Sequence, residues 1–436
     1  MNVRILVSAA VLVLAWIVPA QAATKIEEVI SPGGIKAWLV EDHSNPIIAL
    51  DVSFSGGASL DPEGKAGLSD FVSDLLDEGA GDLDSQTFQG KLQDLSIQMS
   101  FNTARDTFDV GLKTLTDNRD TAFSMLGLAL TKPRFDPDAI ERIREQVLSN
   151  LSDAIDSPNS VANRTLAALL FPKHPYGRPS DGDPDSIKAI TRDDLVNWVG
   201  HHLGRDTMIV SVVGDITPGQ LKPLLDSTFG GLPAKADPIA VPDTTPAIGI
   251  VKVVHKPVPQ SVAVFAEQGV KRNDPDWYTA LVMNYILGGG GFSSRLMTEV
   301  REKRGLAYQT DSYLLPREHA ALIGGQVGTR NDRMAESLAV IRAEWTRMAE
   351  KGVTDAELAG AKKFLNGSFP LELGSTGAIA ELLDTLQRNK LGIDYLDRRT
   401  GLIDSVTAAD VKRVAHKLLV ENQLVVVVVG NPKGME

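Results

Sequence analysis

The chain has 436 residues, of which 43% are hydrophobic and 23% charged, a balance typical of a folded protein rather than a disordered one. Its formal net charge of −12 at pH 7 excludes the basic surface on which nucleic-acid binding depends. The sequence contains no cysteine, so disulfides do not stabilise it, and its length predicts two domains or more.

The N-terminus has the pattern of a secretory signal peptide over residues 1–22. Arg4 precedes an apolar run over residues 5–18, and an Ala-Gln-Ala triplet ending at Ala22 matches a cleavage site. We expect cleavage after Ala22, with Ala23 as the neighbouring option. A membrane anchor is the alternative, but the run is short for a bilayer span of about 20 residues. The pattern predicts export, most simply to a bacterial periplasm, with no membrane span after cleavage.

An internal repeat divides the rest of the chain into two similar halves. Thr191 and Thr407 each stand before a helix-like segment, in the position of an N-cap. Each segment is followed by a valine-rich strand that ends at Gly214 or Gly430. The threonines and the glycines are both separated by 216 residues. A repeat of this size predicts a duplicated domain rather than a solenoid of short units.

The order of elements within each half predicts an α+β fold. Two strands come first, over 35–41 and 47–55 in the first half, followed by a helix, further strands, two or three helices and a final strand. We expect two homologous domains, each a mainly antiparallel sheet with helices packed on one face. The predicted domains cover residues 23–232 and 247–436, and a proline-rich linker over 233–246 joins them.

Three stretches of the mature chain resemble the pitrilysin or mitochondrial-processing-peptidase family of inverted-zincin metallopeptidases. Residues 67–79 are similar to the first helix of that family, and residues 174–179 to a loop after a later helix. The most specific match is the glycine run of residues 288–291 together with the segment that follows it to Tyr308. The resemblance implies a peptidase fold and a peptide ligand.

The zinc motif that the resemblance implies is degenerate in this sequence. Active members carry H-x-x-E-H on the first helix, so that two imidazoles share one helix face and one zinc ion. The matching positions here are Asp70, Ser73 and Asp74, and the later glutamate ligand falls on Asn150. Both imidazoles, the general base and the third ligand are therefore replaced, and we expect a non-catalytic member without bound metal.

Asp70 and Asp74 leave a second reading open, because two carboxylates four residues apart could hold a hard cation weakly. A solvated helix face is the favoured interpretation, since the opposite face of this helix forms an apolar stripe. The seven histidines are scattered or, at His201 and His202, adjacent, and they predict no other metal site. The stripe consists of Leu68, Phe71, Val72, Leu75 and Leu76.

The second half keeps the other part of the family's site. By the resemblance, Arg301 and Tyr308 match an arginine and a tyrosine that bind substrate and stabilise the transition state, and guanidinium and phenol groups suit that role. Surface ion pairs for Arg301 and simple packing for Tyr308 are the alternatives. The segment 100–108 resembles the edge strand to which peptides add. The glycines of 288–291 favour close approach of a peptide or of the facing domain over a simple turn.

These features predict the zinc-free subunit of an exported metalloendopeptidase complex. A homologous partner would carry the zinc, in a heterodimer or larger assembly, and Arg301 and Tyr308 would act in trans on its peptide substrate. One alternative is a peptide-binding or structural scaffold protein with no role in catalysis. A second is an independent hydrolase that uses Asp70 and Asp74 with another metal.

Overall fold

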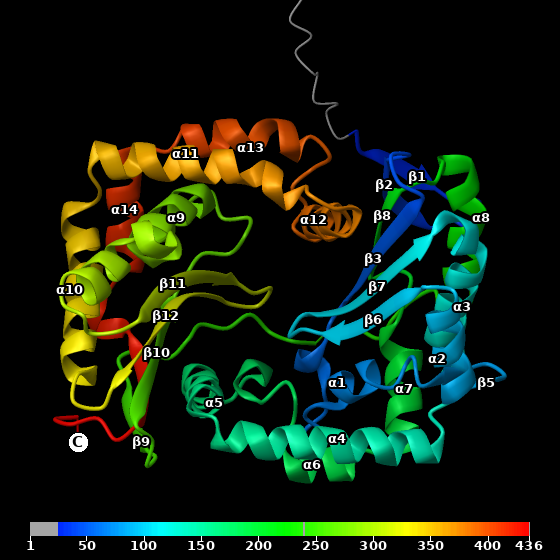
Figure 1. The fold of residues 1–436 in the computed structure, drawn as a ribbon, viewed down its shortest axis with the longest axis horizontal. Helices are drawn as coiled ribbons and strands as arrows, with labels where there is room; N and C mark the ends of the chain where they lie inside the picture. The colour runs from blue at the N-terminus through cyan, green and yellow to red at the C-terminus, as the bar shows by residue number, and fades with distance from the viewer. Residues whose placement is uncertain (1–24, 239, 436) are drawn as a thin grey trace, which may run out of the picture.

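The computed structural model describes residues 25–238 and 240–435, and the predicted signal peptide lies outside them. Two β-sheets stand on opposite sides of the molecule, and the long helices α11 and α4 run between them along opposite edges (Figure 1). The strands of the first sheet all precede residue 215, and those of the second all follow residue 250. Each half of the sequence therefore forms its own sheet.

The first sheet has six strands in the order β1-β2-β8-β3-β7-β6. All neighbouring pairs are antiparallel except β2 with β8, which run parallel. The strands are β1 (Glu27–Ile30), β2 (Lys36–Glu41), β3 (Ile47–Ser55), β6 (Gln98–Thr103), β7 (Thr107–Leu115) and β8 (Met208–Gly214), and a separate hairpin pairs β4 (Gly79–Ala80) with β5 (Leu83–Asp84).

The second sheet repeats this topology with five strands. Its order is β11-β12-β10-β13-β9, and β13 with β9 is its one parallel pair. Each strand has a counterpart in the first sheet, which confirms the predicted duplication and the α+β class. The strands are β9 (Val251–His255), β10 (Gln260–Gln268), β11 (Gln309–Pro316), β12 (Ala321–Arg330) and β13 (Val425–Gly430).

Helices of the same half cover one face of each sheet. Thr191 and Thr407 cap equivalent helices, each accepting a hydrogen bond from the third backbone N–H of its helix, as predicted. The first half contains α1 (Leu68–Ser73), α2 (Ser85–Asp94), α3 (Arg119–Thr131), α4 (Pro137–Asp156), α5 (Pro158–Leu170), α6 (Pro184–Ala189), α7 (Arg192–His202) and α8 (Pro218–Phe229). The second contains α9 (Trp277–Asn284), α10 (Met334–Lys351), α11 (Asp355–Glu372), α12 (Thr376–Arg388), α13 (Tyr395–Asp404) and α14 (Ala408–Leu418). Short 3-10 or π-helical segments are η1 (Ala58–Leu60), η2 (Thr116–Asn118), η3 (Pro175–Gly177), η4 (Tyr285–Gly289), η5 (Gly291–Ser293), η6 (Met297–Glu302) and η7 (Glu421–Gln423).

The opposite face of each sheet is covered by a helix of the other half. Leu166 and Leu170 of α5 pack with Val264 and Val427 of the second sheet. In return, Leu383 of α12 packs with strands β3 and β8 of the first sheet. Because each half lends one helix to the other, burial of apolar surface joins the halves into one body.

No helix within residues 25–238 and 240–435 is long and apolar enough to cross a membrane.

Candidate functional site

Helix α1, the predicted position of the degenerate zinc motif, is held by its N-terminus and by its apolar stripe. Gly67 precedes it with φ of 86°, and a Cβ there would lie 2.8 Å from the backbone nitrogen of Gly182. The buried carboxylate of Asp61 accepts hydrogen bonds from the backbone N–H groups of Gly67 (2.8 Å) and Ser69 (3.0 Å). All five residues of the predicted stripe are buried. The helix is therefore anchored on the face opposite to the zinc-motif positions.

The four degenerate positions do not offer a set of zinc ligands. The Ser73 hydroxyl donates a hydrogen bond to the carbonyl of Asp70 (2.6 Å). Asp74 ends the helix with an exposed side chain, and Asn150 is exposed on α4. A zinc site needs three or four imidazole, thiolate or carboxylate ligands, whereas only Asp70 and Asp74 of these residues carry such a group, so the set does not fit the ion.

Asp70 differs from the predicted solvated aspartate because its side chain is half-buried. Burial, and next the charge of Asp74, raises the pKa of the Asp70 carboxyl to about 7. A cation would relieve this repulsion, but two carboxyls are few for a calcium or magnesium site. Within the described residues, no group of three or more His, Cys, Asp or Glu side chains is placed to hold a metal ion.

The segment 100–108, predicted to be the edge strand that receives peptides, forms the end of β6, a turn and the start of β7. Of these two strands, only β6 lies at an edge of the first sheet (Figure 1). Its inner side pairs with β7. Thr103 at its end donates a hydrogen bond to the carbonyl of Ser69 in α1 (2.9 Å), which places the edge strand beside the degenerate helix. Its outer backbone groups are suited to pairing with an extended peptide, without any need for a catalytic residue.

Arg301 and Tyr308, the two residues that the resemblance assigns to substrate binding, lie in contact with each other. The guanidinium carbon of Arg301 lies 4.8 Å from the centroid of the Tyr308 ring and 4.6 Å from that of Phe292. The cation is thus held by two aromatic rings, and Tyr308 is 78% and Phe292 66% exposed. Phe292 was not predicted as a site residue, because nothing in its spacing indicates contact with an arginine nine positions later.

The ion pairs around Arg301 are made by its neighbours. The buried carboxylate of Glu299 accepts from Lys303 (2.7 Å) and from Arg304 (2.6 Å). Within the described part of the chain, no hydrogen bond or ion pair engages the side chains of Arg301 and Tyr308, and none joins them to α1. Their donor groups are therefore open to a ligand, unlike those of a surface ion pair or a packed phenol.

The glycine run makes close contacts, but within its own half. A Cβ at Gly288 would lie 2.5 Å from the backbone nitrogen of Ser312 in β11, and one at Gly289 would lie 2.7 Å from the Asn284 amide nitrogen. Only Gly291, with φ of 55°, has open space around it. These close contacts are with the chain's own half, and among the described residues none of them is with the facing domain. The expected approach of a peptide stays a prediction.

A cavity of about 760 Å³ lies next to the Arg301 cluster. Ser293, the neighbour of Phe292, lines it, and so do Tyr285 and Phe364, whose rings stack with centroids 5.0 Å apart. Phe364 and Leu371 of α11 are exposed. The cavity thus places apolar surface beside the cationic stack, a combination that suits peptide side chains.

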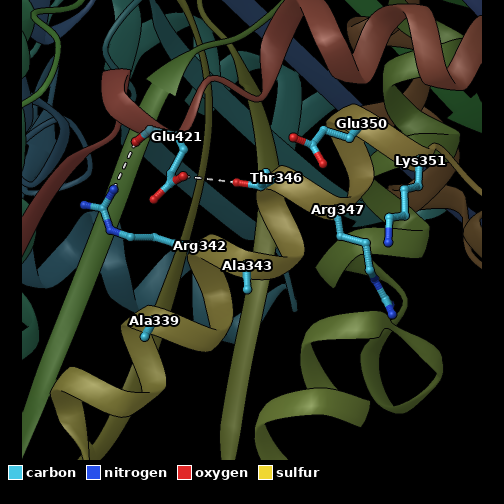
Figure 2. A pocket seen from close by; sticks show the side chains of 8 residues that line it. All are labelled: Ala339, Arg342, Ala343, Thr346, Arg347, Glu350, Lys351 and Glu421. Carbon is cyan, nitrogen blue, oxygen red and sulfur yellow. Dashed lines mark hydrogen bonds between the residues drawn. The ribbon is translucent and has the colours of Figure 1, made fainter.

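A second depression, of about 530 Å³, lies on the outer face of α10 (Figure 2). There the backbone carbonyl of Glu421 accepts from Arg342 (3.0 Å) and its carboxylate from Thr346 (3.2 Å). Figure 2 shows these groups occupied with one another across the helix surface, without converging on an empty centre. This depression is an ordinary polar helix surface.

Two family models match the chain in succession. Residues 36–183 match "Insulinase (Peptidase family M16)" and residues 189–365 match "Peptidase M16 inactive domain". The chain is 29% identical to "Non-peptidase homolog YmxG" of Helicobacter pylori, covering 80% of this chain and 81% of that one. It is 26% identical to a probable mitochondrial-processing peptidase subunit beta of Schizosaccharomyces pombe, covering 88% and 86%.

A solved structure has the same fold. It is described as a peptidase M16 inactive domain from Pseudomonas fluorescens, and it aligns with a TM-score of 0.88 at 27% identity, covering 94% of this chain and 98% of that one. The two-half architecture is therefore shared along nearly the whole length of both chains.

Proposed function

Because the chain belongs to the insulinase family of peptidases, M16, we propose that it is the zinc-free subunit of an exported peptidase complex. A homologous partner would carry the zinc, and this chain would supply Arg301, Tyr308 and half of a peptide chamber. The observation that carries the proposal is the Arg301 guanidinium, set between two exposed aromatic rings with its donors open to a ligand.

The degenerate helix supports a division of labour between two chains. Positions 70, 73, 74 and 150 hold no imidazole, so the chain is not equipped to cut peptides by zinc chemistry alone. The similarity to a non-peptidase homologue supports the view that this chain is non-catalytic by itself. The mitochondrial relative is named as a subunit, which supports assembly as the working state of such chains.

Arg301 and Tyr308 would act on the carbonyl oxygen of the scissile peptide bond. A guanidinium and a phenol both donate hydrogen bonds, and they stabilise an oxyanion most when charge develops on it in the transition state. The rings of Phe292 and Tyr308 limit the motion of the guanidinium, so that less entropy is lost on binding. The partner would hold the metal and the scissile part of the peptide. The exposed edge of β6 in this chain would offer a further place for the peptide to pair as a strand.

The test is to express this chain with an exported homologue that has an intact H-x-x-E-H motif and to measure turnover of a fluorogenic peptide. We expect Arg301→Ala or Tyr308→Phe to lower turnover about 100- to 1,000-fold, with co-elution and the partner's zinc content unchanged. Arg342→Ala, on the outer face of α10, is the matched control and should leave turnover unchanged.

The competing function is a lid or scaffold without a part in catalysis. A pair that cleaves peptides at an unchanged rate when Arg301 and Tyr308 are both replaced would establish this second function. The absence of any exported homologue with the intact motif from the same genome would point the same way.

A further inference from the structure

A cavity of about 840 Å³ lies where the two halves meet, and Arg301 is not among its lining residues. One lining residue, Asp181, lies next to Gly67 at the start of α1. Its walls come from α5, from the loop after η3 and from the hairpin formed by β11 and β12. Figure 1 shows the tip of this hairpin pointing across the molecule toward the hairpin of β6 and β7. The tips are joined directly, since the backbone N–H of Glu318 donates to the Asp106 carboxylate (3.1 Å).

Four arginines line this cavity, namely Arg105, Arg164, Arg178 and Arg317. Arg164 forms an ion pair with Asp181, which also lines the cavity. Within the described residues, none of the other three arginines forms an ion pair. The lining therefore carries more positive than negative charge.

Arg105 and Arg317 are both half-buried in the lining of this cavity. Burial, and next the charge of Arg317, lowers the pKa of Arg105 to about 10. Burial likewise lowers the pKa of Arg317. Asp106 and Asp181 are the nearby acids. The Asp106 carboxylate already accepts from the Tyr176 hydroxyl (2.6 Å) and from the backbone of Glu318, and Asp181 is paired with Arg164.

Arg317 also carries a buried donor without a partner. Its Nη1 is shielded from solvent and makes no hydrogen bond to any described residue, while its guanidinium carbon lies 5.1 Å from the Tyr176 ring centroid. A buried, unpaired donor on a charged group is costly. An anion placed between these arginines would satisfy the donor and reduce the repulsion at once.

Much of the remaining wall is apolar, although serine, threonine and asparagine side chains also line it. Two leucines of α5 form the apolar part, together with the phenylalanine that directly follows α5 and one leucine from each strand of the hairpin. The Tyr313 ring lies beside them. A free inorganic ion would leave this wall without a partner. Its apolar members are Leu166, Leu170, Phe171, Leu315 and Leu322.

We propose that this cavity binds an organic anion, with a carboxylate or phosphate group between Arg105, Arg178 and Arg317 and an apolar body on the opposite wall. Guanidinium groups bind both kinds of oxyanion in a bidentate manner, so the geometry fits this shared chemistry. The site requires no zinc and no partner subunit, and it is independent of the peptidase proposal. Because both halves contribute arginines, a bound anion would also strengthen the junction between them.

The experiment is isothermal titration of the purified chain at low ionic strength with phenyl phosphate, 3-phenylpropanoate, inorganic phosphate and benzyl alcohol. We expect one molecule of a phenyl anion to bind per chain, more tightly than inorganic phosphate, and benzyl alcohol not to bind. The tighter of the two phenyl anions identifies the natural anion as a phosphate ester or a carboxylate. Failure of both to bind, or equal binding by the neutral alcohol, would overturn the proposal.

Two variants assign the site. Arg317→Gln and Arg178→Gln should each weaken binding of the phenyl anion about 10-fold or more, because each removes a charged hydrogen-bond donor. Arg342→Gln, beside the depression on α10, is the control and should bind as the natural chain does. Thermal unfolding without ligand distinguishes anion binding from a purely structural role. If an arginine only ties the hairpins together, its replacement should lower the unfolding midpoint and leave the affinity for the phenyl anion unchanged. That result at both positions would contradict the proposal.

Discussion

Ser53 in β3 donates its hydroxyl hydrogen to the carboxylate of Asp384 in α12, across 331 positions of the chain. The same carboxylate pairs with Arg388 one helical turn later (2.8 Å). Gln387 of the same helix donates to the Ser211 hydroxyl in β8 (2.8 Å). Polar as well as apolar contacts thus hold α12 on the sheet of the other half.

Because α5 and α12 each pack on the sheet of the other half, we predict that the two halves unfold together. Leu383→Ala should lower the free energy of unfolding by about 2–5 kcal/mol, because the leucine is fully buried between α12 and the first sheet. Chemical denaturation followed by circular dichroism measures the change. Leu371→Ala, at a position 80% exposed, should shift it by no more than about 0.5 kcal/mol. Two separate transitions in the natural chain would refute the coupling of the halves.

The interface of α12 also predicts a dependence of stability on pH. Burial, followed by the charges of Asp384 and Asp109, raises the pKa of Asp51 to about 7, against an unfolded value of about 4. The folded state therefore binds more protons between these values, and this contribution to stability is lost as pH rises toward 7. Asp51→Asn should raise the free energy of unfolding at pH 8 and change that free energy less at pH 5.

Urea denaturation at several pH values measures this effect. Asp117→Asn removes one negative charge at an exposed position and serves as the control. A stability difference between Asp51→Asn and the natural chain that is the same at pH 5 and pH 8 would show that the Asp51 proton is not involved.

The aromatic support of Arg301 predicts a graded effect on catalysis by the reconstituted pair. Phe292→Ala should lower peptide turnover about 2- to 5-fold, since an exposed cation–π contact contributes about 0.5–1 kcal/mol. The loss is smaller than for removal of Arg301 because the donor remains. Steady-state kinetics measure it, and a loss as large as that of Arg301→Ala would mean that Phe292 contacts the substrate itself.

The donor set on α1 predicts that the purified chain holds no stoichiometric zinc and cleaves no peptide. Metal analysis after dialysis and a peptidase assay with added Mg²⁺, Mn²⁺ or Ca²⁺ measure this. Asp70→Ala and Asp74→Ala should change turnover of the reconstituted pair little. One tightly held zinc ion per chain, or activity with an added cation, would instead favour an independent hydrolase.

Local features of the chain were predictable because they depend on neighbouring residues. The strand over 47–55 follows from its apolar pattern and has the predicted bounds. The N-caps at Thr191 and Thr407 need only a side-chain oxygen at a helix start, so both were identified correctly. The half-buried state of Asp70 was missed, because it depends on what packs over α1.

The sequence by itself determined the duplication, the α+β class and the loss of imidazole from the zinc positions, since these depend on residue identity and periodicity. Only the tertiary structure decided that α5 and α12 each pack on the sheet of the other half and that Phe292 lies on Arg301. It likewise decided that Arg105 and Arg317 line the same cavity. The physical reason is that these contacts form between segments that are brought together only when the chain folds. Their energy comes from burial and charge at positions that no local pattern relates.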